Sequence, residues 1–475
     1  MKSLNKMSIY GLASLFVLIN LFSCSDDFPE ALDSGSNFTV IKSIKIVSAG
    51  ETGNGVVEGV VNEDTKEITF PRLDTLTNFQ NLKFEAELSN GATLDKEVYP
   101  VTFLEGESEK TIVIKVQNLP RYREYLVKLR LKVPVYGADF SLPTVYDFSA
   151  NKGPAAVYPA FAGQLTRGTG FDGKYVLIAS RGTSGVHLLD VEKLKVNDKT
   201  PIPLSTTGVT GGTYSYNMAA QVNGHSYVAS LSGAATSPLK LYHWASPTST
   251  PEVVADINVA AIPGAAARHG DNFSIALDAN GNGYAFFTSA TSNIIRVKIE
   301  NYNRSTEVSL ISTATNYEQW STVNLVGNTG TYIIGGHSKP ISLIDASGKA
   351  SHTFAVSTLP IGSADPRVIN FNGERYLLTI TIPRGAPNGI NSVLRVYNIT
   401  RGATINDAFV AFEQTEKKPV YEFLISGATN TAPGTQSGFY VVKDAKGKDQ
   451  KLMIYGATTD AGFAIIEFPV NIAKD

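Results

Sequence analysis

About 340 residues in the C-terminal part of the chain repeat one pattern of apolar and polar positions six times. Each repeat consists of a turn that contains glycine, an aromatic-rich strand that ends in small residues, a loop, and a second apolar strand. The six turns are Asp172-Gly173, Asn223-Gly224, Asn280-Gly281, Asn328–Gly330, Asn372-Gly373 and Lys446-Gly447. Repeats of 40 to 75 residues or so that contain only strands are typical of a β-propeller. The pattern therefore predicts a six-bladed β-propeller over residues 138–475.

The interval before the last turn is the longest, and it has two interpretations. Residues Ala403–Gln414 look helical and would be an insertion, whereas a degenerate seventh blade is the alternative. A propeller must also close its ring, because an open ring exposes strand edges. Thr144–Phe148 precedes the first repeat and alternates in β fashion, so we expect it to form the outer strand of the last blade, beside Phe463–Phe468.

Residues 39–134 show short apolar runs separated by polar turns, without a long helical period. The predicted strands are Lys42–Val47, Gly55–Val61, Glu67–Phe70, Leu82–Leu88, Thr111–Val116 and Tyr125–Lys132. The last of these alternates apolar and charged residues, as a half-buried strand does. We therefore expect an all-β chain, in which an Ig-like β-sandwich over residues 39–134 precedes the propeller.

Residues 1–23 have the layout of a secretory signal. Lys2 and Lys6 precede an apolar run over Ile9–Leu21, which is too short to cross a bilayer. Ser23 and Cys24 then form a bacterial lipobox, which predicts cleavage before Cys24 and acylation of that residue; a plain secretion signal is the alternative. Residues 24–38 read as a flexible tether. Their acidic start resembles the surface-export signal of Bacteroidetes lipoproteins, so we expect a lipid anchor in the outer membrane that faces the cell exterior, with an ordinary solvated tether as the alternative.

Charge and cysteine content exclude several classes of function. The chain has 41 Lys and Arg against 43 Asp and Glu, and this balance does not fit a nucleic-acid-binding protein. Cys24 is the only cysteine, so the mature chain has neither disulfides nor thiol catalysis. Asp278–Gly283 matches half of a calcium loop but coincides with a repeat turn, which is the favoured interpretation. No histidine pair has metal-ligand spacing, and we expect no metal and no cofactor.

The repeat also places side chains near the propeller axis. Residues several positions before each glycine turn, and those that follow the second strand, should meet on the face opposite the turns. The first ring contains Arg167, Tyr216, Asn217, Arg268, His269, Gln319, Trp320, Arg367 and Gln436, and the second contains Arg181, Ser232, Ser289, His337, Arg384 and Asp460. From these we select Arg167, Arg181, Tyr216, Asn217, Arg268, His269, Trp320, His337, Arg367 and Arg384 as candidate ligand-binding residues.

Arginine and aromatic side chains in one pocket favour an anionic or polyhydroxylated ligand, because guanidinium forks suit carboxylates and aromatic faces suit sugar rings. The alternative is structural: the arginines pair with carboxylates between blades, and Trp320 packs against a neighbouring blade. His269 or His337 would be a general base in an enzyme, and Asp365 and Asp460 are the acids best placed by register. No catalytic motif is present, so no catalytic residue is assigned.

The lipobox, the Ig-like pattern and the propeller repeat together resemble Bacteroidetes surface lipoproteins with a propeller domain of unknown function. The resemblance implies capture of nutrients, above all glycans, beside an outer-membrane transporter. We rank three functions: a non-catalytic glycan-binding protein, then a propeller glycoside hydrolase or lyase, then an adhesive or scaffolding subunit of a surface complex. The sequence favours a protein that is not an enzyme, without deciding the matter.

Overall fold

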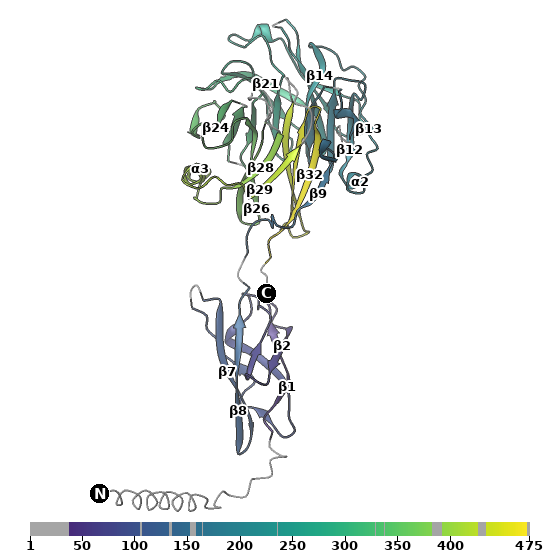
Figure 1. Cartoon of the computed structure of the whole chain (residues 1–475). Coiled ribbons are helices and arrows are strands. Elements are labelled where there is room, and N and C mark those ends of the chain that lie inside the picture. The colour runs from purple at the N-terminus through teal and green to yellow at the C-terminus, as the bar shows by residue number, and fades with distance from the viewer. Residues whose placement is uncertain are drawn as a thin grey trace, which may run out of the picture. The chain divides into compact units, whose positions relative to one another are not determined.

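The computed structural model describes residues 38–472, apart from 105–106, 133–134, 153–157, 164, 235, 328, 337, 382–391 and 426–433. The chain divides into two compact units (Figure 1): the first ends at Val135 and the second is Tyr136–Ile472. Three of the predicted site residues, Cys24, His337 and Arg384, lie outside the described residues. None of the helices in the described part of the chain is long and apolar enough to cross a bilayer.

The first unit is built from one eight-stranded sheet around one apolar core. The strands follow the order β5-β7-β8-β3-β2-β1-β4-β6. Their bounds are β1 (Ile41–Ala49), β2 (Gly55–Asn62), β3 (Glu67–Thr69), β4 (Leu82–Leu88), β5 (Thr93–Leu94), β6 (Val98–Tyr99), β7 (Glu109–Asn118) and β8 (Arg121–Arg130), with a 3-10 turn over Phe79–Asn81. All six predicted strands are present. β5 and β6 were not predicted, because strands of two residues leave no alternation to detect. The Ig-like assignment stays a prediction.

The second unit contains six four-stranded antiparallel sheets, which confirms the six-bladed propeller. Blade 1 consists of β10 (Thr166–Phe171), β11 (Tyr175–Ser180), β12 (Val186–Asp190) and β13 (Ile202–Pro203). Blade 2 consists of β14 (Tyr214–Val222), β15 (His225–Leu231), β16 (Leu239–Trp244) and β17 (Glu252–Ile257). Blade 3 consists of β18 (Phe273–Leu277), β19 (Gly283–Phe287), β20 (Asn293–Glu300) and β21 (Arg304–Ser312). Blade 4 consists of β22 (Thr322–Leu325), β23 (Tyr332–Gly336), β24 (Lys339–Ile344) and β25 (Ala350–Thr353). Blade 5 is β26 (Ser363–Phe371), β27 (Glu374–Thr381), β28 (Ser392–Asn398) and β29 (Tyr421–Ile425).

Blade 6 closes the ring in the predicted way. It consists of β30 (Thr435–Lys443), β31 (Asp449–Thr458), β32 (Gly462–Pro469) and, as its outermost strand, β9 (Thr144–Asp147). β9 pairs with β32 through registers such as Tyr146 with Ile465 (Figure 1). The first strands of the blades also contact one another around the axis, and β30 returns to β10. β9 therefore covers the outer edge of β32, as the sequence predicted.

The long last interval contains α3 (Ile405–Glu413) rather than a seventh blade. Thr404 begins this helix with a capping box, in which its side chain and that of Asp407 bond each other's backbone N–H. Phe409 and Phe412 then bury one face against the core of blades 4 and 5. The other described helices are α2 (Val191–Lys195) and three short 3-10 turns, Ala150–Lys152, Pro159–Phe161 and Val259–Ala261.

The innermost strands approach so closely that some positions admit only glycine. A Cβ on Gly168 would lie 2.5 Å from the backbone nitrogen of Ala219 on the next blade. Polar side chains near the axis then join blades directly. The Gln436 amide of blade 6 donates to the Ala219 carbonyl oxygen of blade 2 at 3.0 Å, and the Ser274 hydroxyl of blade 3 donates to the Val323 carbonyl oxygen of blade 4 at 2.8 Å.

Candidate functional site

The innermost strands have two ends, which define two faces of the propeller. We call the end where these strands begin the loop face, and the end where they reach the glycine turns the turn face. The sequence predicted that all candidate side chains gather on the loop face. The structure brings four of them together there, on blades 1 to 3: Arg167, Arg181, Asn217 and Arg268. It places Arg367 at the turn face.

Three arginines surround one buried carboxylate at the loop face, and we call Arg167, Arg181, Arg268 and Asp271 the arginine cluster. The guanidinium of Arg268 grips Asp271 through two nitrogens, with Nε at 2.5 Å from Oδ2 and Nη2 at 2.7 Å from Oδ1. Nη1 of Arg167 lies 3.7 Å from Oδ1 of the same carboxylate. Asp271 precedes β18 and is almost completely buried. It therefore holds two arginines from different blades in fixed positions.

Arg181 completes the cluster from the end of β11. Its Nε donates to Oδ1 of Asn217 at 2.8 Å, and its guanidinium lies over the exposed ring of Tyr214, 3.8 Å from the ring centroid. Burial, followed by repulsion from the Arg167 charge, lowers the pKa of Arg181 to about 10. The side chain remains cationic at neutral pH, but its charge is incompletely compensated.

Cations exceed carboxylates within the arginine cluster. Among the described residues, Asp271 is the carboxylate that ion-pairs with the cluster, against three guanidinium groups. The segments inside the propeller that fall outside the described residues contain Arg384 and His337 but no Asp or Glu. A site with fixed, partly desolvated arginines and unbalanced positive charge is suited to an anionic group of a ligand.

Other predicted loop-face residues have structural surroundings. His269 is fully buried, its Nδ1 lies 3.1 Å from the carbonyl oxygen of Phe287, and burial lowers its pKa. Its backbone forms a bridge with Ser232 of the neighbouring blade. Tyr216 packs against the apolar core of blades 1 and 2, and the backbone oxygen of Trp320 accepts a hydrogen bond from Asn272 at 3.3 Å. These placements favour the structural alternative for His269 and Tyr216.

The hydroxyls of the second ring are also engaged in structural bonds. Ser232 donates to the Ser237 carbonyl oxygen at 2.9 Å, and Ser289 donates to the Asn293 carbonyl oxygen at 2.8 Å. Oδ1 of Asp460 accepts from the backbone N–H of Gly163 at 3.2 Å. In the first ring, the backbone oxygen of Gln319 accepts a hydrogen bond from the Thr288 hydroxyl at 3.4 Å.

Arg367 and Asp365 lie deeper along the axis than the sequence predicted. Arg367 lines a cavity of about 730 Å³ at the turn face, together with the ends of the other innermost strands. Asp365 is buried beneath it and accepts hydrogen bonds from Asn324 Nδ2 at 3.0 Å and from the Ser437 hydroxyl at 3.0 Å. This carboxylate joins blades 4, 5 and 6, so the structure shows it in a positioning role.

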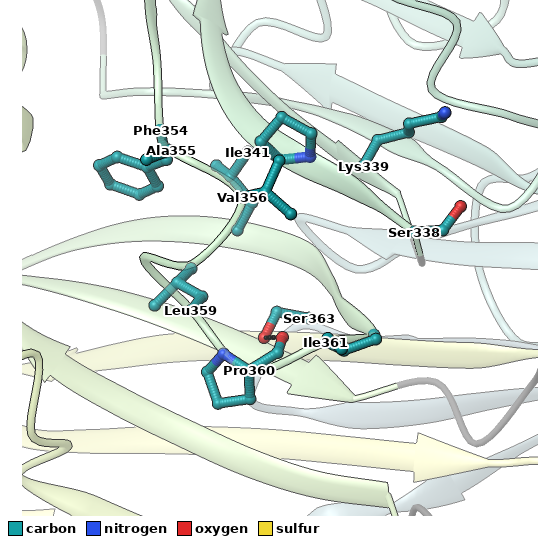
Figure 2. A pocket seen from close by; sticks show the side chains of 12 residues that line it. Ser338, Lys339, Ile341, Phe354, Ala355, Val356, Leu359, Pro360, Ile361 and Ser363 are labelled. Carbon is teal, nitrogen blue, oxygen red and sulfur yellow. Dashed lines mark hydrogen bonds between the residues drawn. The ribbon is translucent and has the colours of Figure 1, made fainter. Parts of the chain in front are cut away.

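A small apolar pocket lies apart from the cluster, between the start of β24 and the loop that precedes β26 (Figure 2). Its walls include Ile341, Phe354, Val356 and Leu359, and its volume is about 50 Å³. Ligand pockets begin at roughly 300 Å³, so this one is too small for a sugar ring.

The predicted turn at Asp278–Gly283 is confirmed. The Asp278 carboxylate accepts hydrogen bonds from the backbone N–H groups of Asn280 at 2.8 Å and Asn282 at 2.9 Å, which shapes the hairpin. Within the described ranges, no group of three His, Cys, Asp or Glu side chains is arranged to hold a metal ion.

Sequence reasoning missed two residues of the site, Asp271 and Tyr214. Asp271 follows Arg268 by three residues and therefore had a local signal: a carboxylate at this spacing can fold back on the arginine. Tyr214 begins β14, where the register with β15 shifts between Tyr214 and Met218. Such an irregularity breaks the alternation of side chains, so the hydrophobic pattern carries no signal for Tyr214.

Two solved structures are similar to this chain to different degrees. A crystal structure of a DUF4623 family protein from Bacteroides eggerthii is 42% identical, covers 91% of this chain and 99% of its own, and superposes with a TM-score of 0.76. A GH43_1 enzyme from Xanthomonas citri, in complex with xylose, is 12% identical with a TM-score of 0.32, covering 53% of this chain and 91% of its own. A likeness at that level supports no argument about activity.

Among curated proteins, the chain has no significant match in sequence. The family model described as "Domain of unknown function (DUF4623)" matches residues 26–471 and so spans both structural units. The chain therefore belongs to the DUF4623 family.

Proposed function

We propose that this protein is a lipoprotein, anchored through Cys24 on the outer face of the outer membrane, whose propeller binds a glycan at the loop face for nutrient capture. An Ig-like module then serves as the spacer, and an outer-membrane transporter is the expected partner. The observation that carries the proposal is the arginine cluster, in which one carboxylate pairs with two guanidinium groups and a third guanidinium, that of Arg181, lies close enough to be repelled by Arg167. This charge excess favours an acidic glycan, and the exposed ring of Tyr214 offers a face for a sugar.

The enzyme alternative finds less support in the described residues. A glycoside hydrolase of the usual kind needs two carboxylates, one on each side of the scissile bond. Asp271 pairs with Arg268 and Arg167. The carboxylate of Asp365 accepts hydrogen bonds from Asn324 and Ser437 near the propeller axis, and His269 is fully buried. Binding without bond cleavage is the function that these contacts fit best.

The binding proposal is tested by calorimetric titration of acidic and neutral oligosaccharides into the chain that begins at Ser25. We expect an acidic oligosaccharide to bind, and Arg181→Gln to weaken it about tenfold to a hundredfold, the effect of losing one hydrogen bond to a charged group. Arg296→Gln is the matched control. Arg296 lies over Tyr284 at 4.9 Å, as Arg181 lies over Tyr214, but on an outer blade position. Equal affinity of the wild type and Arg181→Gln would refute the site.

The location is tested separately, in cells of the source bacterium. We expect Cys24→Ser to abolish incorporation of a labelled fatty acid, and protease added to intact cells to remove the wild-type protein. Incorporation that survives the substitution would refute the anchor. Protection from external protease would refute the outward orientation while leaving the binding proposal intact.

A further inference from the structure

The turn face holds a cavity that the arginine cluster does not reach. Its volume is about 730 Å³, within the range of roughly 300–1,000 Å³ that ligand pockets occupy. All six innermost strands contribute to its lining, which includes Arg367, Gln221, Asn324, Asn370, Phe439 and Tyr440. Amide, guanidinium and aromatic groups therefore converge on the propeller axis from different blades.

Two cations line this cavity, Arg367 and Lys174, and each lies near a carboxylate. Arg367 faces Asp365, with Nη2 at 3.5 Å from Oδ2, and Lys174 is accompanied by Asp172 on the same rim. The loop-face cluster, by contrast, has three cations around one carboxylate. The two ends of the axis thus differ in the ligand charge that they favour.

Hydrogen-bonding capacity remains available in the lining. Nε of Arg367 donates to the Ser437 hydroxyl at 3.1 Å and Nη2 faces Asp365, which leaves Nη1 without a hydrogen-bond partner among the described residues. Gln221 accepts a hydrogen bond from Ser226 at 2.8 Å, but its amide nitrogen is buried and has no partner in the described part of the chain. Buried polar groups are normally satisfied, so an unpaired amide in a cavity wall is available to bond a polar group of a ligand.

The aromatic wall is fixed in place before any ligand binds. The ring of Tyr440 lies directly against Gly173, where a Cβ would approach ring atoms to 2.3 Å. The Asp172 carboxylate accepts a hydrogen bond from the backbone N–H of Gly224 at 2.8 Å, which joins the turns of blades 1 and 2. Tyr440 is still 44% exposed. A rigid, exposed aromatic ring beside amide groups suits the apolar face of a sugar ring.

We propose that the turn-face cavity is a second site, independent of the arginine cluster, that binds a neutral saccharide. Tyr440 stacks on the sugar ring, while Arg367, Gln221 and Asn370 bond its hydroxyls. This site does not depend on the function proposed for the loop face.

The test uses the chain from Ser25 and a panel of neutral probes: glucose, galactose, mannose, xylose, cellobiose and maltose. Crystals are soaked with each probe, and saturation-transfer NMR measures its binding in solution. We expect at least one probe to seat in the cavity, and Tyr440→Ala to weaken it tenfold or more. Tyr122→Ala, at an exposed tyrosine of the first unit, is the matched control and should bind as the wild type does.

Three results would overturn the proposal: no probe of the panel in the cavity, a probe bound equally well by Tyr440→Ala, or a probe seated at the loop face. Arg181→Gln separates the two sites, because it removes a cation only from the arginine cluster. Loss of acidic-oligosaccharide binding in Arg181→Gln, with neutral binding kept, is the pattern expected when both proposals hold. Loss of neutral binding in Arg181→Gln contradicts the independence of the turn-face site.

Discussion

Replacing Asp271 with Asn removes one negative charge from the centre of the arginine cluster while keeping the size of the side chain. In the wild type this carboxylate is 1% exposed and compensates Arg167, which is 7% exposed, and Arg268, which is 47% exposed. We expect two consequences. The protein loses stability, because buried positive charge is less compensated, and it gains affinity for small anions, because the competing carboxylate is gone.

The magnitude follows from burial. Breaking a buried ion pair costs about 3–5 kcal/mol, and the half-exposed Arg268 adds only about 0–1 kcal/mol because solvent screens it. At 3.7 Å the Arg167 pair is too long for a strong hydrogen bond, so the lower end, about 3 kcal/mol, applies. The propeller of about 340 residues has an unfolding entropy of about 0.7 kcal/mol/K, so Tm should fall by about 4 °C.

The assay is scanning calorimetry of the propeller transition, with sulfate added in the low millimolar range and sodium chloride of equal ionic strength as reference. Ligand that binds only the folded state raises Tm with its concentration. We expect sulfate to raise Tm more in Asp271→Asn than in the wild type. The double variant with Arg181→Gln should lose this extra response, because one of the three guanidinium groups is gone. An unchanged Tm, or an equal sulfate response in all three proteins, would refute the reasoning.

Two further predictions concern acid stability and blade packing. His243 is 2% exposed, and burial, followed by repulsion from His225, lowers its pKa to about 4, whereas unfolded histidine titrates near about 6.5. Between these two pKa values the unfolded state binds more protons than the folded state, so stability falls as the pH drops through that window. We therefore expect His243→Gln to lose less Tm between pH 7 and 4.5 than the wild type loses. An identical loss of Tm in the two proteins would contradict this. Gly168→Ala should lower the free energy of unfolding, measured with denaturant, by at least about 3 kcal/mol, because the added Cβ meets the Ala219 backbone. Gly447→Ala, where the Cβ would meet open space, should lower it by about 1–2 kcal/mol through backbone strain alone. Equal losses in the two variants would contradict the close packing of the innermost strands.

Much of the propeller was predictable because its turns have a strict backbone requirement. Gly173, Gly224, Gly281, Gly373 and Gly447 all adopt φ between 77° and 86°, a region that other residues avoid. Selection for glycine at these turns makes the repeat visible in one sequence. The closing strand was predictable for a different reason: six blades in a ring leave one strand edge to cover, and the alternating segment Thr144–Phe148 lies between the first unit and the first repeat.

The site was predictable only where the strand register is regular. Bulges interrupt β10 between Thr166 and Gly168, and β26 between Ala364 and Arg367. A bulge shifts the alternation and turns side chains to a new direction, and its location is not encoded in a hydrophobic pattern. At Asp365 the backbone has φ of 43°, and Arg367 lines the turn-face cavity instead of the loop face. Contacts between blades, such as Arg181 with Asn217, join residues far apart in the chain and become visible only in three dimensions.

The central claim is that the propeller binds an acidic glycan without cleaving it. A glycan-array screen of the chain that begins at Ser25, with release of reducing ends measured in parallel, tests it most directly. The account predicts retention of acidic glycans on the array, loss of that retention in Arg181→Gln, and no release of reducing ends. Release of reducing ends by the wild type would contradict the binding function in favour of an enzyme, and an array without any retained acidic glycan would contradict the loop-face site.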